Sequence, residues 1–176
     1  SGLGTEAAGV VSKVGRGVTH IKEGDRVVYA QSALGAYSSV HNVPADKAAI
    51  LPAAISFEQA AASFLKGLTV FYLLRKTYEI KPEETFLFHA AAGGVGLIAC
   101  QWAKALGAKL IGTVGSAQKA QRALDAGAWQ VINYRDENLV ERLKEITNGK
   151  KVSVVYESVG KETLEASSDC LQSHGP

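Results

Sequence analysis

The stretch FLFHAAAGGVGLIAC, residues 86–100, decides the fold class of this chain. An apolar run ends in a turn of small residues, and an apolar helical pattern begins directly after it. This order is typical of a strand, a tight turn and the start of a helix in a βαβ unit. Within the turn, residues 91–96 read Ala-x-Gly-x-x-Gly, which lacks only the first glycine of the Gly-x-Gly-x-x-Gly fingerprint of dinucleotide-binding sites.

The glycines of the turn have separate physical tasks in such a site. Gly93 lets the backbone approach a pyrophosphate, Gly96 lets the helix pack closely on the strand, and the amides of the first helical turn face an anion. We therefore predict that the cofactor-binding residues of the turn are Ala92, Gly93, Gly94 and Val95. Because Ala91 replaces the first glycine, a glycine-rich turn without a ligand stays open as the alternative.

The rest of the second half repeats the same unit. The pattern predicts strands over 85–90, 109–114, 130–133 and 152–157, with helices over 95–106, 117–126, 137–148 and 162–171. Gly107, Gly127 and Gly149 each follow a predicted helix, where a left-handed residue commonly ends it. Strands that alternate with helices of this length predict a parallel sheet with right-handed crossovers. The last of these helices would lead to a fifth strand, which we expect this chain not to contain.

The first part of the chain has a different pattern. Short β-branched runs over 7–14, 27–30 and 35–43, separated by glycine turns, predict a small antiparallel β unit. Ser56 and Gln59 form a capping-box pattern that starts a helix through residues 60–62, and a second helical stretch is predicted over 67–76. We predict two domains, residues 1–65 and residues 66–176.

Composition excludes several classes of protein. The 176 residues are 47% hydrophobic and 20% charged with a net charge of +2, so we expect a buried core and no nucleic-acid or membrane partner. Cys100 and Cys170 are too few for a disulfide framework, and with no visible signal peptide we expect a cytoplasmic protein. Because the chain starts at Ser1 and ends where a strand is expected, we predict a fragment of a longer protein.

The choice of dinucleotide depends on the end of the second strand of the repeat. An acidic residue there would bind the ribose 2′-hydroxyl of NAD, but residues 113–116 contain none. Gly115, the Ser116 hydroxyl and Lys119 would instead accept a 2′-phosphate, so these residues favour NADPH. The alternative is that Lys119 lies on a solvated helix face. Tyr134 ends the third strand and is predicted to contact the same phosphate, or else is a surface aromatic residue.

A family likeness rests on AAAGGVGLIACQWAKALGAKLIGTVGSAQKAQRALDAGAWQVINY and on GLGTEAAGVVSKVG, GDRVVYA, AYSSVHNVP and FLKGLTVFYLLRKTY. These stretches resemble the NADPH-dependent quinone oxidoreductases of bacterial type, the zeta-crystallin-like branch of the medium-chain dehydrogenase/reductase superfamily. The resemblance implies an α/β fold: a partial Rossmann-type parallel sheet with helices on both faces, plus part of a GroES-like antiparallel β domain. It covers the chain up to about residue 173.

The resemblance also implies roles for individual residues. Lys119 and Tyr134 match the family's phosphate-binding positions, and residues 158–160 match the region near the nicotinamide ribose. Thr69 resembles a family residue near the nicotinamide and is the one catalytic candidate, beside Lys66. The alternative is that Thr69 and Lys66 only join the domains.

The resemblance also bears on metal and substrate. Zinc alcohol dehydrogenases of the superfamily carry Gly-His-Glu where this chain reads Gly4-Thr5-Glu6, so we expect no metal, and His89 is expected to be a satisfied core histidine. The expected activity is hydride transfer from NADPH to a small-molecule quinone by a homodimer. The alternatives are an enoyl or alkenal reductase of the same superfamily, and a non-catalytic, crystallin-like protein that binds NADPH or RNA.

Overall fold

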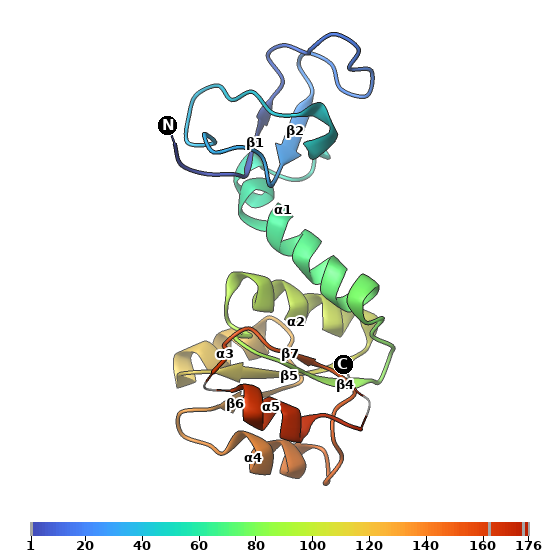
Figure 1. The fold of residues 1–176 in the computed structure, drawn as a ribbon, viewed down its shortest axis with the longest axis vertical. Helices are drawn as coiled ribbons and strands as arrows, with labels where there is room; N and C mark the ends of the chain where they lie inside the picture. Colours follow the sequence, from blue (N-terminus) through green and yellow to red (C-terminus); the bar gives the residue numbers. More distant parts are fainter. Residues whose placement is uncertain (1, 162, 174, 176) are drawn as a thin grey trace. The chain divides into compact units, whose positions relative to one another are not determined.

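The computed structural model describes residues 2–161, 163–173 and 175, and the chain divides into two compact units (Figure 1). The units are Ser1–Leu68 and Thr69–Pro176, and the division falls within helix α1 (Phe57–Phe71). The predicted domain boundary between residues 65 and 66 falls in the same helix. Each unit is described by itself below.

The first unit is built on a three-stranded antiparallel sheet. Its strands are β1 (Ala7–Val10), β2 (Arg26–Tyr29) and β3 (Ala48–Ile50), with β2 in the centre and a 3₁₀ turn, Ala45–Lys47, before β3. Val28 on β2 packs with Leu51 and Ala60 to form the small core of this unit. The Arg26 guanidinium donates hydrogen bonds to the carbonyls of residues 52, 53 and 55, and it fastens the segment between β3 and α1.

The predicted strand over residues 35–43 is wrong. This segment forms bends and has no strand partner, and the third strand of the sheet is β3 instead. The Ser38 hydroxyl donates to the carbonyls of Gly35 and Val40, at 2.6 and 2.9 Å. Such local side-chain bonds to the backbone compete with a strand ladder, and the alternation of residues does not reveal them.

Helix α1 begins with the predicted capping box. The Ser56 amide donates to Gln59 Oε1 at 3.0 Å, and the Gln59 amide donates to Ser56 Oγ at 3.1 Å. The helix then runs without a break to Phe71 and continues as a π-helical turn, Tyr72–Thr77. The prediction of two separate helices is therefore wrong, because Gly67 is tolerated inside α1 at a cost of only about 1 kcal/mol.

Removal of the Ser56 cap has a measurable expected effect. The Ser56→Ala variant loses one of the two reciprocal bonds, so we expect the free energy of unfolding to fall by about 1 kcal/mol. Urea denaturation followed by circular dichroism measures this change. A Ser63→Ala variant is the control, because Ser63 only donates back to the Gln59 carbonyl within the same helix. Equal stability of the two variants would contradict the capping role.

The second unit confirms the predicted α/β fold. All neighbouring strands in the sheet are parallel, and their order is β6-β5-β4-β7. The strands are β4 (Thr85–Phe88), β5 (Lys109–Val114), β6 (Gln130–Asn133) and β7 (Val155–Tyr156), and the helices are α2 (Gly94–Leu106), α3 (Ala117–Asp125), α4 (Leu139–Ile146) and α5 (Leu164–Cys170). The glycines at 107, 127 and 149 have positive φ, as predicted.

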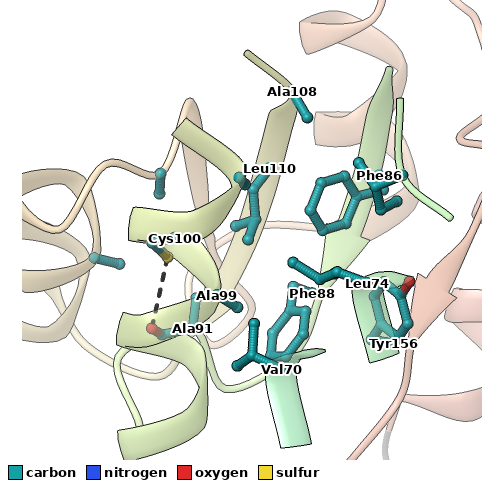
Figure 2. Close-up of a cluster of buried hydrophobic side chains, with 14 of the residues drawn as sticks. Val70, Leu74, Phe86, Phe88, Ala91, Ala99, Cys100, Ala108, Leu110 and Tyr156 are labelled. Carbon is teal, nitrogen blue, oxygen red and sulfur yellow. Dashed lines mark hydrogen bonds between the residues drawn. The ribbon is translucent and has the colours of Figure 1, made fainter. Parts of the chain in front are cut away.

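Helices cover both faces of this sheet, because alternate strand residues point to opposite sides. On one face, the side chains of Phe86, Phe88 and Leu110 pack against α2 (Figure 2). On the other face, Leu87 and Ile111 pack against α4 and α5. Figure 1 shows α2 and α4 on opposite sides of the strands.

The last part of the sheet differs from the prediction. Strand β7 holds only two residues instead of the predicted 152–157, and Val152 makes a separate parallel bridge with Leu171. This bridge is isolated, and among the described residues no strand follows α5. The predicted helix over 162–171 is α5, which begins at Leu164, and Glu162 lies outside the described residues. Within the part of the chain that the structure describes, no helix is long and apolar enough to cross a bilayer.

Candidate dinucleotide site

The strand order of the second unit reverses beside β4. The chain moves from β4 to β5 and β6 on one side, and it then returns to place β7 on the other side of β4. Ligands of open α/β sheets bind at such a reversal, beyond the carboxyl ends of the strands. The turn after β4 and the loop after β7 flank this position.

The turn after β4 has the form that an anion site requires. The Ala91 amide donates to the Thr113 carbonyl at 3.0 Å, and the Gly93 amide donates to the Ala90 carbonyl at 2.8 Å. Gly93 is the N-cap of α2, and no side chain caps this helix. The first amides of α2 are therefore not occupied by a capping side chain and can bind an anionic group.

The close approach predicted for Gly96 is present. A methyl group at Gly96 would lie 2.5 Å from the carbonyl oxygens of both Ala90 and Ala91. A methyl group at Gly112 on β5 would lie 2.5 Å from the Ala91 Cβ. The sequence pattern missed Gly112, which makes room on the adjacent strand for the alanine that replaces the first glycine of the fingerprint.

The end of β5 forms a second group of site residues. A methyl group at Gly115 would lie 2.9 Å from Tyr134 Oη and 3.4 Å from Arg135 Nε, so both side chains lie against this glycine. Ser116 caps α3, with its hydroxyl accepting from the Lys119 amide at 3.4 Å. The Lys119 side chain is exposed, and no acidic partner is found for it among the described residues.

The structure thus places the predicted cofactor residues at the carboxyl ends of neighbouring strands in one parallel sheet. Residues 92–95 span the turn after β4 and the start of α2, and those at 115, 116, 119 and 134 lie around the end of β5. Arg135 was missed as a candidate, although an arginine directly after a strand of the repeat was a usable signal. Thr69 is half-buried in α1, and its catalytic role stays a prediction.

A buried polar network lies beside the ends of β4, β5 and β7 and includes His89, which is fully buried. His89 Nδ1 lies 2.9 Å from Thr113 Oγ1, and Nε2 lies 2.8 Å from Ser167 Oγ, so His89 is the satisfied core histidine that we expected. Burial lowers the pKa of His89 more than the nearby Glu157 carboxylate raises it, so the imidazole is neutral at physiological pH.

The described side chains do not fit a zinc site. Among residues 2–161, 163–173 and 175, no group of three or more His, Cys, Asp or Glu side chains is placed to hold a metal ion. Both cysteines are buried, and the Cys100 thiol donates to the Ala91 carbonyl at 3.9 Å (Figure 2). Glu6, which follows Thr5, lies 3.5 Å from the Lys66 ammonium.

Both thiols are expected to be unreactive in the folded chain. Burial raises the pKa of Cys100 and of Cys170 to about 11, so roughly one thiol in a thousand is ionised at pH 8. Titration with a disulfide reagent at pH 8 should show no fast reaction in buffer and two reactive thiols in urea. A fast reaction in buffer would contradict the burial of these side chains.

Comparison with known proteins agrees with the two units. A family described as alcohol dehydrogenase GroES-like domain matches residues 1–53, and a family described as zinc-binding dehydrogenase matches residues 94–176. A quinone oxidoreductase of Salmonella typhimurium is 87% identical over 175 residues, which are 99% of this chain and 54% of that protein. A 2-haloacrylate reductase of Burkholderia is 45% identical over 98% of the chain and 53% of its own length.

A solved structure supports the same relationship. The crystal structure of Escherichia coli quinone oxidoreductase complexed with NADPH superposes with a TM-score of 0.94 at 87% identity, over 97% of this chain and 52% of that chain. The chain therefore spans about half the length of the curated relatives it matches. Residues 1–53 and 94–176 are therefore similar to the GroES-like and zinc-binding dehydrogenase families, and the chain as a whole is similar to one half of the bacterial quinone oxidoreductases.

Proposed function

We propose that this chain provides the NADPH-binding residues of an enzyme that reduces a quinone. The main support for this proposal comes from the end of β5. There, Tyr134 and Arg135 lie against Gly115, and residues 113–116 include no carboxylate. This arrangement accepts a 2′-phosphate and would not hold a ribose 2′-hydroxyl through an acid. The NADPH complex of the Escherichia coli relative supports the proposal.

Each part of the site then has its own task. The backbone at Gly93 and the amides of the first turn of α2 bind the pyrophosphate, since no side chain caps this helix. The Ser116 hydroxyl and the Lys119 ammonium bind the 2′-phosphate, with the Tyr134 ring beside them. NADPH, when bound, supplies a hydride to the acceptor. The chain's own contribution is to hold the dinucleotide in one orientation across the sheet edge.

A second candidate is reduction of a conjugated alkene. The 45% identity to a 2-haloacrylate reductase favours this alternative, because a haloacrylate is itself a conjugated alkene. The test joins this chain to the flanking residues of the Salmonella typhimurium relative and compares NADPH oxidation with 1,4-benzoquinone and with a 2-enoyl thioester. We expect faster turnover with the quinone. Faster turnover with the thioester would favour the alternative.

We further propose that the 176 residues alone bind NADPH without efficient quinone reduction. The supporting observation is that the matched relatives are about twice as long as this chain. Rapid NADPH oxidation by the 176-residue chain with 1,4-benzoquinone would overturn this proposal. We also propose a homodimer and a cytoplasmic location. Size-exclusion chromatography of this chain joined to the flanking residues of the Salmonella typhimurium relative tests the homodimer.

A further inference from the structure

The loop between β7 and α5 is held by the carboxylate of Glu157, which is connected to the glycine turn through Ser167 and His89. We propose that Glu157 is a positioning residue, which holds residues 158–160 beside the glycine turn as part of the dinucleotide site. This inference rests on the proposed function, because it assigns these residues to the nicotinamide half of NADPH. It concerns how the loop is held, and no direct contact of Glu157 with a ligand is part of it.

The Glu157 carboxylate accepts hydrogen bonds from residues of the loop and of α5. Its Oε1 accepts from the amides of Val159 and Gly160, at 2.7 and 3.1 Å. The Thr163 hydroxyl donates to the same carboxylate at 2.9 Å, and the Ser167 hydroxyl donates to Oε2 at 2.7 Å. Two backbone amides of the loop and two hydroxyls, one in α5 and one at its N-cap, therefore bind the same carboxylate and hold the loop around it.

This carboxylate is ionised under all ordinary conditions. Burial alone would raise the pKa of Glu157, but hydrogen bonds from Ser167, from the Gly160 and Val159 amides and from Thr163 outweigh burial and lower it to about 2. A carboxylate accepts at every one of these positions, whereas a neutral amide side chain has one acceptor oxygen and would present donors to the other groups.

His89 continues the network toward the glycine turn. Because the Ser167 hydroxyl donates to Glu157, its oxygen accepts from His89, so Nε2 carries the hydrogen. Nδ1 is then the acceptor for the Thr113 hydroxyl. The Thr113 carbonyl in turn accepts from the Ala91 amide, which opens the glycine turn. The loop after β7 is thus connected to the turn after β4 by hydrogen bonds through Ser167 and His89 to the Thr113 side chain, and by the bond of the Thr113 backbone carbonyl to the turn.

The position of the loop indicates which half of the cofactor it serves. The parallel register pairs Phe88 with Tyr156, so the loop and the glycine turn leave the sheet side by side. The proposed 2′-phosphate site lies at β5 and β6, on the other side of β4. A dinucleotide whose pyrophosphate lies at the glycine turn must therefore extend its nicotinamide half past β7.

The test compares two ligands on the Glu157→Gln variant of the full 176-residue chain by isothermal titration calorimetry. NADPH contains both halves, whereas adenosine 2′,5′-bisphosphate contains only the half that binds at β5. We expect the variant to bind NADPH about tenfold more weakly and the bisphosphate within twofold of the original chain. The control is Glu165→Gln on the exposed side of α5, for which we expect no change with either ligand.

A second variant tests the proposal if Glu157→Gln folds poorly, and a measurement without ligand tests it if Glu157→Gln folds well. Thr163→Val removes one donor to the carboxylate, and we expect a loss of two- to threefold for NADPH alone. In the Glu157→Gln chain without ligand, the Val159 and Gly160 amides should exchange hydrogen at least tenfold faster, with Phe88 and Ile111 unchanged. These exchange rates report the anchoring of the loop independently of cofactor binding.

Three results would overturn the inference. Equal losses for both ligands would show a purely structural role, and unchanged NADPH affinity together with unchanged exchange would show that the loop does not depend on Glu157. If the original chain binds neither ligand while exchange still rises in Glu157→Gln, the proposed function fails and the loop has no cofactor to position. This last pattern separates failure of the proposed function from failure of the anchoring.

Discussion

Replacement of Gly96 with alanine is expected to lower the free energy of unfolding by about 1–3 kcal/mol and to remove measurable NADPH binding. The added methyl group would lie 2.5 Å from two backbone oxygens and 2.6 Å from the Ala91 carbonyl carbon. Backbone atoms cannot rotate away as a flexible side chain can, so α2 must move away from the turn. Urea denaturation and NADPH fluorescence titration measure the two effects.

The matched control for this variant is Gly67→Ala. Gly67 also lies inside a helix, but a methyl group there meets no atom within 4 Å. We expect this substitution to leave NADPH binding unchanged and to stabilise the chain by up to about 1 kcal/mol, because alanine has the higher helix propensity. If Gly96→Ala behaved like Gly67→Ala, the close packing of α2 on the turn would be disproved.

The Lys119→Ala variant is expected to bind NADPH about tenfold to a hundredfold more weakly, because a charge-assisted hydrogen bond contributes about 1.5–3 kcal/mol. NADH has no 2′-phosphate, so its affinity should not change. The preference of the original chain for NADPH should also fall as salt is raised, since Lys119 is exposed. Fluorescence titrations with both dinucleotides at two salt concentrations measure these differences.

The control for this charge is Lys144→Ala. Lys144 is an exposed lysine in α4, which packs on the face of the sheet opposite α2. The Lys144→Ala substitution removes the same positive charge as Lys119→Ala but leaves the end of β5 unchanged. An equal loss of NADPH affinity in both variants would show only a long-range effect of charge, and an unchanged affinity in Lys119→Ala would refute the assigned role.

The local features of this protein could be predicted from its sequence because they depend on neighbouring residues. The strand, turn and helix around residues 86–100 follow from one apolar run and its glycines, and the capping box follows from Ser56 and Gln59. The parallel sheet follows from repetition of the same unit. The absence of an acid after β5 is likewise visible without coordinates.

The features that sequence reasoning missed depend on contacts between distant segments. Gly112 matters only because the register of β4 and β5 brings it against Ala91. The role of Glu157 depends on α5 folding back so that Ser167 reaches both Glu157 and His89. The wrong strand over 35–43 has the same origin, because hydroxyl bonds made by Ser38 replace the ladder that residue alternation suggests.

Chemical-shift mapping of the 176-residue chain during an NADPH titration tests the central claim most directly. The account predicts that the largest amide shifts fall on residues 92–96, 115–119 and 158–160, and that NADH moves the first group with much smaller shifts at 115–119. Those residues follow the carboxyl ends of β4, β5 and β7 in the second unit's sheet. Shifts concentrated elsewhere, or identical maps for NADPH and NADH, would contradict the assignment of this edge as an NADPH site.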